Sequence, residues 1–76
     1  MASIVGVQCF LARKALGWSL RDLAEAAELA SDTVRRFECG GTVKVSTLEA
    51  IQRTLEKAGV IFIDASDGGP GARLRR

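Results

Sequence analysis

The chain contains no histidine and no tyrosine, and its 76 residues include only two cysteines and one proline. Without histidine, Cys9 and Cys39 cannot complete a Cys/His zinc site. The missing residue types are also common proton-transfer groups, and the sequence offers no plausible pairing of a nucleophile with a base. We therefore expect no metal, no cofactor and no enzymatic activity.

Long apolar runs are also missing. No stretch approaches the roughly 18 apolar residues that a membrane span needs, and the first residues lack the charged and apolar regions of a signal peptide. The two cysteines lie far apart in the chain, which favours free thiols in a reducing compartment. We expect a cytoplasmic protein that makes no contact with a membrane.

The body of the chain has no excess of basic residues. The net charge is +2, but Arg73, Arg75 and Arg76 supply three of the eleven basic side chains. Residues 1–72 hold eight basic and nine acidic side chains, a net charge of −1. This is a weak electrostatic signal for binding to nucleic acid. The terminal arginines either keep the chain soluble or add nonspecific affinity for DNA.

Apolar spacing predicts a small, mainly α domain. A chain of this length buries only about 60% of the surface of its unfolded form, so oligomerisation would add useful buried area. Apolar side chains recur every three or four residues, as in Cys9, Ala12 and Leu16, which is the period of one helical face. The predicted helices cover residues 7–16, 19–28, 31–38 and 46–58.

Serine and glycine mark where these helices begin and end. Ser19 with Asp22, and Ser46 with Glu49, have the three-residue spacing of a capping box. Ser31 is the predicted cap of the third helix. The helices are expected to end at Gly17, at Gly40-Gly41 and at Gly59. Cys9 is most simply a small core residue, and Trp18 a core anchor.

The period changes after residue 59. "VIFID", residues 60–64, is β-branched and aromatic, which predicts a strand that is apolar on both faces. "ARLR", residues 72–75, alternates again and is expected to pair back as a hairpin or to pair with another chain. The expected organisation is a leader at residues 1–6, a helical domain at 7–59, and a strand or hairpin with a basic tail at 60–76.

Two short helices joined by a tight turn inside a small bundle form a helix-turn-helix. The segment "GWSLRDLAEAAELASDTVRRFECGGTVKVSTLEAIQRTLEKAGVIFID" resembles the Cro/C1-type (XRE) helix-turn-helix family, the lambda-repressor-like DNA-binding domains. The specific marks are "DLAEAA", "TV-RFE-G" and the tail "GGPGARLR", and the likeness extends over residues 7–76. It implies four or five helices with a short C-terminal strand or hairpin.

The resemblance also implies a function. Such a protein is expected to regulate transcription, as a repressor or small controller, by binding double-stranded DNA as a homodimer at an inverted repeat. Its third helix would lie in the major groove. The resemblance and the helix ends together give a candidate DNA-binding set, which is Ser19, Ser31, Asp32, Thr33, Arg35, Arg36 and Lys44. Ser19 would offer its backbone N–H to a phosphate.

Several positions depart from that family. Leu20 replaces a usual glutamine, Glu28 a usual glycine, and Phe10 a usual polar residue. Asp32 puts a negative charge where the groove would be. It caps its helix or balances the dipole, accepts a hydrogen bond from cytosine N4, or belongs to a protein-binding surface.

These departures leave a second function open. It is a helix-turn-helix that binds protein, such as an anti-activator that sequesters another regulator, and an antitoxin is a third possibility. Arg35 and Arg36 would then be solvated charges. The residues expected at the dimer or partner interface are Phe10, Ile61, Phe62, Ile63 and Leu74.

Overall fold

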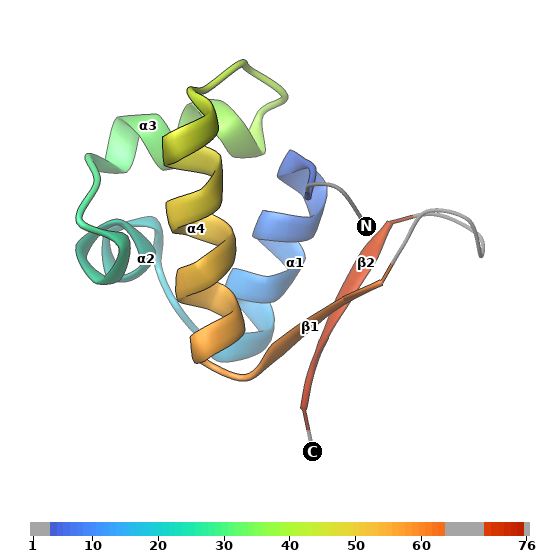
Figure 1. The fold of residues 1–76 in the computed structure, drawn as a ribbon. Helices are drawn as coiled ribbons and strands as arrows, with labels where there is room; N and C mark the ends of the chain where they lie inside the picture. Colours follow the sequence, from blue (N-terminus) through green and yellow to red (C-terminus); the bar gives the residue numbers. More distant parts are fainter. Residues whose placement is uncertain (1–3, 64–69, 76) are drawn as a thin grey trace.

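A computed structural model describes residues 4–63 and 70–75 of the chain. Four helices are followed by a two-stranded hairpin, which confirms the predicted mainly α fold with a C-terminal hairpin (Figure 1). The elements are α1 (Gly6–Leu16), α2 (Leu20–Ala27), α3 (Ser31–Glu38), α4 (Val45–Lys57), β1 (Val60–Ile63) and β2 (Gly71–Leu74). The predicted strand residue Asp64 and the tail residue Arg76 lie outside the described residues.

Two of the helix boundaries follow the sequence signals closely. Gly17 ends α1 in the left-handed conformation, with φ of 74°. Ser19 caps α2: its hydroxyl accepts a hydrogen bond from the Asp22 N–H at 3.0 Å, and its own N–H donates to Asp22 Oδ2 at 2.8 Å. The predicted capping box at this helix is confirmed.

The expected caps at Ser31 and Ser46 are wrong. The residues with extended backbone before α3 and α4 are Ala30 and Lys44, and neither makes a side-chain capping bond. The turn before each helix ends earlier than the serines suggested. Ser31 and Ser46 therefore lie inside the first turn of their helices, where a serine hydroxyl no longer meets the free N–H groups in the capping geometry.

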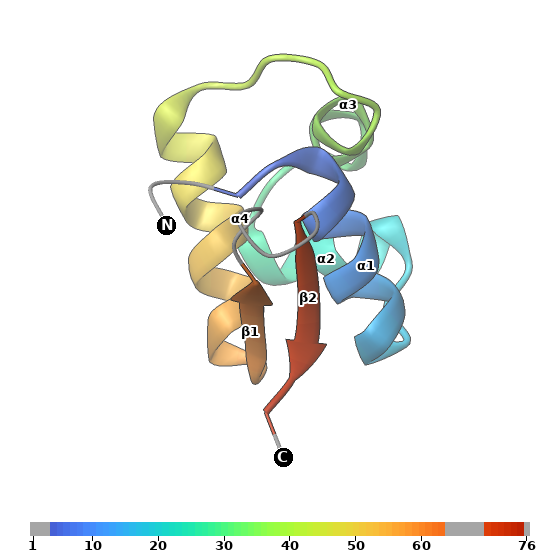
Figure 2. The same ribbon diagram turned by 90° about the vertical axis from the view of Figure 1, so that its right-hand side faces the viewer.

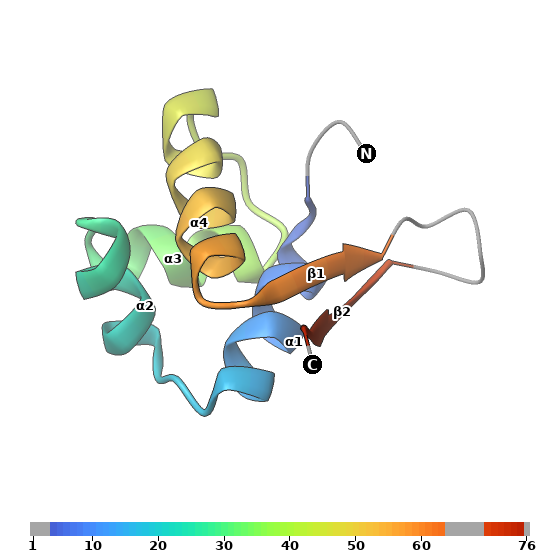
Figure 3. The same cartoon turned by 60° about the horizontal axis from the view of Figure 1, so that its bottom comes forward.

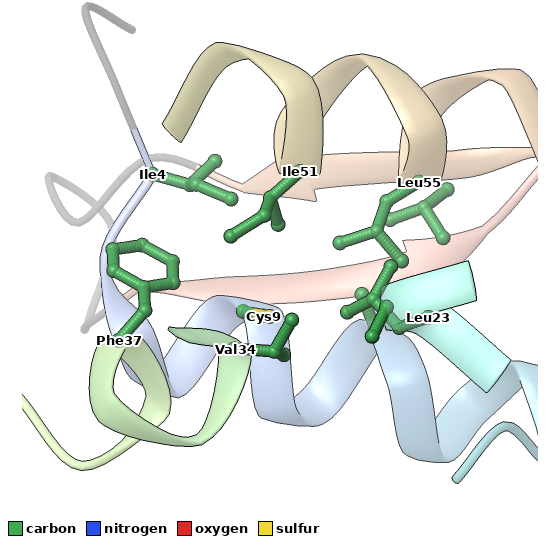
Figure 4. Close-up of a cluster of buried hydrophobic side chains, with 10 residues drawn as sticks. Ile4, Cys9, Leu23, Val34, Phe37, Ile51 and Leu55 are labelled. Carbon is green, nitrogen blue, oxygen red and sulfur yellow. The ribbon is translucent and has the colours of Figure 1, made fainter. Parts of the chain in front are cut away.

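The core lies where the four helices meet. Figure 4 shows apolar side chains from each of them pointing toward one another. Cys9, Leu23, Val34, Ile51 and Leu55 are completely inaccessible to solvent, and the expectation that Cys9 is a core residue is confirmed. Ile4 was expected in a loose leader, yet only 2% of it is exposed. Burying the apolar side chain of Ile4 stabilises the fold, so the core extends to the residues just before α1.

The hairpin covers one side of α1 and α4. Strand β1 lies beside α4 and β2 lies beside α1 (Figure 2). The strands are antiparallel, with Val60 opposite Leu74 and Phe62 opposite Ala72, and these four side chains pack on the core. Ile61 and Ile63 occupy the other face of the hairpin because side chains alternate along a strand.

One side chain connects the hairpin to α1. Gln8 is 1% exposed, and its Nε2 donates to the carbonyls of Ile63 at 2.9 Å and Gly71 at 3.2 Å. Its Oε1 accepts from the Val5 N–H at the start of α1. Because Ile63 and Gly71 face each other across the hairpin, the Gln8 side chain binds both strands at the same place.

The hairpin and the α2–α3 pair lie on opposite sides of the molecule, with α1 and α4 between them (Figures 1 and 3).

Candidate nucleic-acid interface

A tight turn fixes α3 against α2. Glu28 ends α2 in the left-handed conformation, with φ of 60°, and the Leu29 N–H donates to the Ala24 carbonyl at 2.8 Å. This closure is the usual way in which a helix stops sharply. Leu23 of α2 and Val34 of α3 are both fully buried and lock the two helices together. The result is two short helices, joined by three residues, with α3 held firmly at the surface.

Helix α3 separates an apolar face from a polar one. Val34 and Phe37 are buried, with 0% and 7% of their surfaces exposed. All four of the residues Ser31, Asp32, Arg35 and Arg36 are exposed. The helical period places them on the side away from the core, as expected from the sequence. Asp32 lies in the first turn of α3, where a carboxylate is stabilised by the helix dipole.

Glu38, the second acid of α3, does not belong to the outward face. It forms a bidentate pair with Arg13 of α1, through Oε2 to Nε at 2.9 Å and Oε1 to Nη2 at 3.0 Å. Both side chains are only 8% exposed. The pair neutralises Glu38 inside the fold, so the outward face of α3 retains two arginines and one aspartate.

The same pair organises its surroundings. Arg13 Nη1 donates to the Trp18 carbonyl at 2.9 Å, and the Cys9 thiol donates to Glu38 Oε2 at 3.3 Å. Burial, reinforced by the Glu38 carboxylate, raises the pKa of Cys9 well above its ordinary value. The hydrogen bond to Glu38 raises the pKa of Arg13, which stays charged. The cluster is therefore a structural joint between α1 and α3.

A second basic residue joins Arg36 at the end of α3. Arg36 and Lys44 line an open groove of about 490 Å³, together with Thr33, Thr42, Val43 and Thr47. The loop after α3 returns against Arg36: the Gly41 N–H donates to the Arg36 carbonyl at 2.8 Å, and a side chain at Gly41 would collide with the Arg36 stem. Gly41 therefore lets the loop lie directly on Arg36.

This groove combines three of the predicted residues with two that sequence reasoning missed. Thr33, Arg36 and Lys44 come together in it, whereas Thr42 and Thr47 were not predicted. The only available signal was the hydroxyl-rich sequence "TVKVST" beside Lys44. Two cations with three hydroxyl groups are a chemistry suited to a phosphate group.

Ser19 and Arg35 lie outside this groove. The expectation that the Ser19 N–H is available for a phosphate is wrong, because that N–H already donates to Asp22. The Asp22 N–H in the first turn of α2 is likewise engaged, because it donates to the Ser19 hydroxyl. Arg35 is exposed on α3 itself, separate from the groove formed around Arg36.

The residues expected at a dimer or partner interface divide into two groups. Phe10 and Ile63 are 40% and 38% exposed, and Ile61 is half-buried on the outer face of the hairpin. Phe62 and Leu74 instead pack against the core, so they are used within the chain. Leu20, one of the departures from the family that left a protein-binding function open, also packs against the core.

The chain matches no protein-family model, and no curated protein matches it. Among the described helices, none combines the length and apolar character that crossing a bilayer requires.

Proposed function

We propose that the chain is a sequence-specific DNA-binding regulator of transcription, of the Cro/C1-type helix-turn-helix family, with α3 as its recognition helix. The observation that carries this proposal is the exposed face of α3, held by a tight turn from α2 and bearing Arg35 and Arg36. Pairing of Glu38 with Arg13 removes an acid from that face. The surface presented to DNA is therefore more basic than the net charge of residues 1–72 suggests.

Each polar residue then has a separate task. Arg35 pairs with guanine O6 and N7, a contact that discriminates between bases by about 1–3 kcal/mol. Arg36 and Lys44 bind a backbone phosphate in the groove that they share with Thr33. Asp32 accepts a hydrogen bond from cytosine N4, and Ser31 contacts a neighbouring base.

The regulator acts as a homodimer at an inverted repeat, because a two-fold protein matches a palindromic site. Ile61 and Ile63, on the outer face of the hairpin, form part of the contact between copies. The hairpin lies on the opposite side of the molecule from α2 and α3 (Figure 1), so contacts made there leave α3 free.

Operator selection with the purified chain tests this function. A specific site is expected to emerge from random DNA, with affinity that falls steeply between about 50 and 200 mM salt. Arg35→Ala should relax the preference at one base, and Lys44→Ala should weaken all sites alike. Arg53→Ala and Lys57→Ala are matched controls, because both residues are exposed on α4 and neither lines the groove around Arg36. Failure to select any site at low salt would refute the proposal.

The second candidate is a helix-turn-helix that binds another regulatory protein. The observation that favours it is Phe10, which is 40% exposed on α1. Aromatic side chains are enriched at protein interfaces relative to the rest of the protein surface. Purification from the native cell would then recover a stoichiometric protein partner, and recovery of DNA alone would count against it.

A further inference from the structure

Helix α1 is apolar on the side that faces solvent as well as on the side that faces the core. Val7, Phe10 and Leu11 are 47%, 40% and 39% exposed, and Phe10 and Leu11 lie three and four residues after Val7. Cys9 and Ala12 fill the buried side of the same helix. Strand β2 and the helices α3 and α4 contact α1, and none of them covers the side that carries Val7, Phe10 and Leu11. An exposed apolar helix face of this kind is typical of a binding surface.

The exposed apolar surface is concentrated at this helix. Among the described residues, six large hydrophobic side chains are exposed, and four of them fall within residues 5–11. We call Val5, Val7, Phe10 and Leu11 the α1 stripe. The hairpin does not cover it, although Gln8 in the same turn holds the strands. Three side chains at positions i, i+3 and i+4 are the anchors with which a helix binds an apolar partner surface.

The charges beside the α1 stripe specify what kind of partner fits. No residue from Gly6 to Leu16 is acidic, and the last turn carries Arg13 and Lys14. Arg13 is occupied by Glu38, whereas Lys14 is exposed, with its Nζ 5.7 Å from the centre of the Phe10 ring. An acidic partner would form a charge pair with Lys14 and would meet no acidic residue of α1 that repels it.

A second copy of the chain does not fit this surface well. Two α1 stripes facing each other would bring together two cationic helices that contain no acid. A lipid surface also fits poorly, since helices that bind membranes carry many basic residues on their polar face. Lys14 is the one cation of α1 not engaged by a carboxylate within the described chain.

We propose that the α1 stripe is the docking site for an amphipathic helix of another protein, whose apolar side chains are flanked by acidic residues. The apolar side chains of that helix pack on Val7, Phe10 and Leu11, and one of its carboxylates pairs with Lys14. The site lies on α1 and not on α3, so it goes beyond the proposed DNA contact. The regulator can therefore be recognised by protein through a surface separate from its DNA-reading helix.

The test uses a synthetic amphipathic peptide of about 16 residues, more than four helical turns, with a leucine stripe flanked by glutamates. A second peptide carries lysines in place of the glutamates. Binding of the intact chain to each labelled peptide is followed by fluorescence anisotropy, without DNA. The glutamate peptide should bind at least tenfold more tightly than the lysine peptide. Phe10→Gln combined with Leu11→Gln should weaken that binding at least tenfold.

Val45→Gln is the matched control, because Val45 is a 70% exposed valine outside the α1 stripe. It should leave binding unchanged. Lys14→Glu keeps the apolar stripe and should shift the preference toward the lysine peptide, which keeps the test decisive if the double variant unfolds. Equal binding of both peptides, or no effect of Lys14→Glu, would overturn the proposal. Loss of dimerisation in the Phe10→Gln/Leu11→Gln variant would also overturn the proposal. Binding of the chain to vesicles of anionic lipid, and not to the peptide, would overturn it as well.

Discussion

Arg13 and Glu38, 25 residues apart in the chain, meet at the contact between α1 and α3 with two hydrogen bonds of 2.9 and 3.0 Å. Glu38 is the last residue of α3, so this pair fixes the end of the proposed recognition helix against α1. The Trp18 carbonyl and the Cys9 thiol complete the hydrogen bonding of the two charges. Burying two charges is costly, and their mutual attraction with good hydrogen-bond geometry offsets that cost, but removing one partner leaves the other charge without compensation.

Glu38→Gln should therefore destabilise the fold by about 3 kcal/mol, because the Arg13 charge stays buried without its partner. The free energy of unfolding from urea denaturation measures this. Glu49→Gln, at an exposed position of α4, is the control and should change it by less than about 0.5 kcal/mol. A loss below about 1 kcal/mol for Glu38→Gln would mean that Arg13 finds another partner or reaches water.

The two cysteines should differ in reactivity. Cys9 is fully buried and Cys39 is exposed. Burial and the Glu38 carboxylate raise the pKa of Cys9, which keeps it protonated and unreactive. Iodoacetamide should modify Cys39 alone in the folded chain and both residues after unfolding, as read by mass spectrometry. Modification of Cys9 at the same rate as Cys39 would show that the core opens readily.

The raised pKa of Cys9 also predicts an alkaline loss of stability. As the pH rises above the ordinary thiol pKa of 9.0, the unfolded chain loses the Cys9 proton and the folded chain keeps it. The unfolded state then binds fewer protons, so stability falls with increasing pH. Cys9→Ala should remove this slope. Parallel stability curves for the two proteins between about pH 8 and 10 would contradict the assignment.

Gln8 should be essential for docking the hairpin. Gln8→Ala removes two hydrogen bonds to the strands and one at the start of α1, and leaves a cavity. We expect a loss of about 2–3 kcal/mol, with the hairpin amides exchanging faster than those of α4. Hydrogen exchange resolves the two regions. Gln52→Ala is the control, because Gln52 is a half-buried glutamine of α4 whose Nε2 donates to Glu56. Equal acceleration in both regions would show global unfolding instead.

Much of the fold could be predicted from local sequence patterns. The three- and four-residue apolar spacing identified four helices, and the β-branched sequence "VIFI" identified a strand. These signals are local because a helix or strand must turn the same residues inward wherever it lies. The caps of α3 and α4 were missed because serine is suited to several positions near a helix start, and only the backbone angles choose among them.

The candidate site was harder to predict from the sequence, because part of it depends on contacts between segments that are distant in the chain. The helical period predicted that Arg35 and Arg36 face outward, and the resemblance to the helix-turn-helix family made them candidates for contact with DNA. The pairing of Glu38 with Arg13, and the grouping of Thr42 and Thr47 with Arg36, depend on how separate segments pack. No spacing rule links residues that distant in the chain. The charge of a surface therefore follows from the fold, because packing decides which acids are neutralised inside.

Glu28 occupies a backbone conformation that favours glycine, with φ of 60° at the end of α2. A side chain in this left-handed region costs roughly 1–2 kcal/mol, so Glu28→Gly should stabilise the fold by about 1 kcal/mol after its added chain entropy is subtracted. Thermal and urea unfolding measure the change. Gly17→Ala, which puts a side chain at φ of 74°, is the reciprocal control and should destabilise. The turn at Glu28 sets the angle between α2 and α3. If Glu28→Gly is more stable but binds its selected operator less tightly, the strained backbone at Glu28 holds the angle that DNA binding requires.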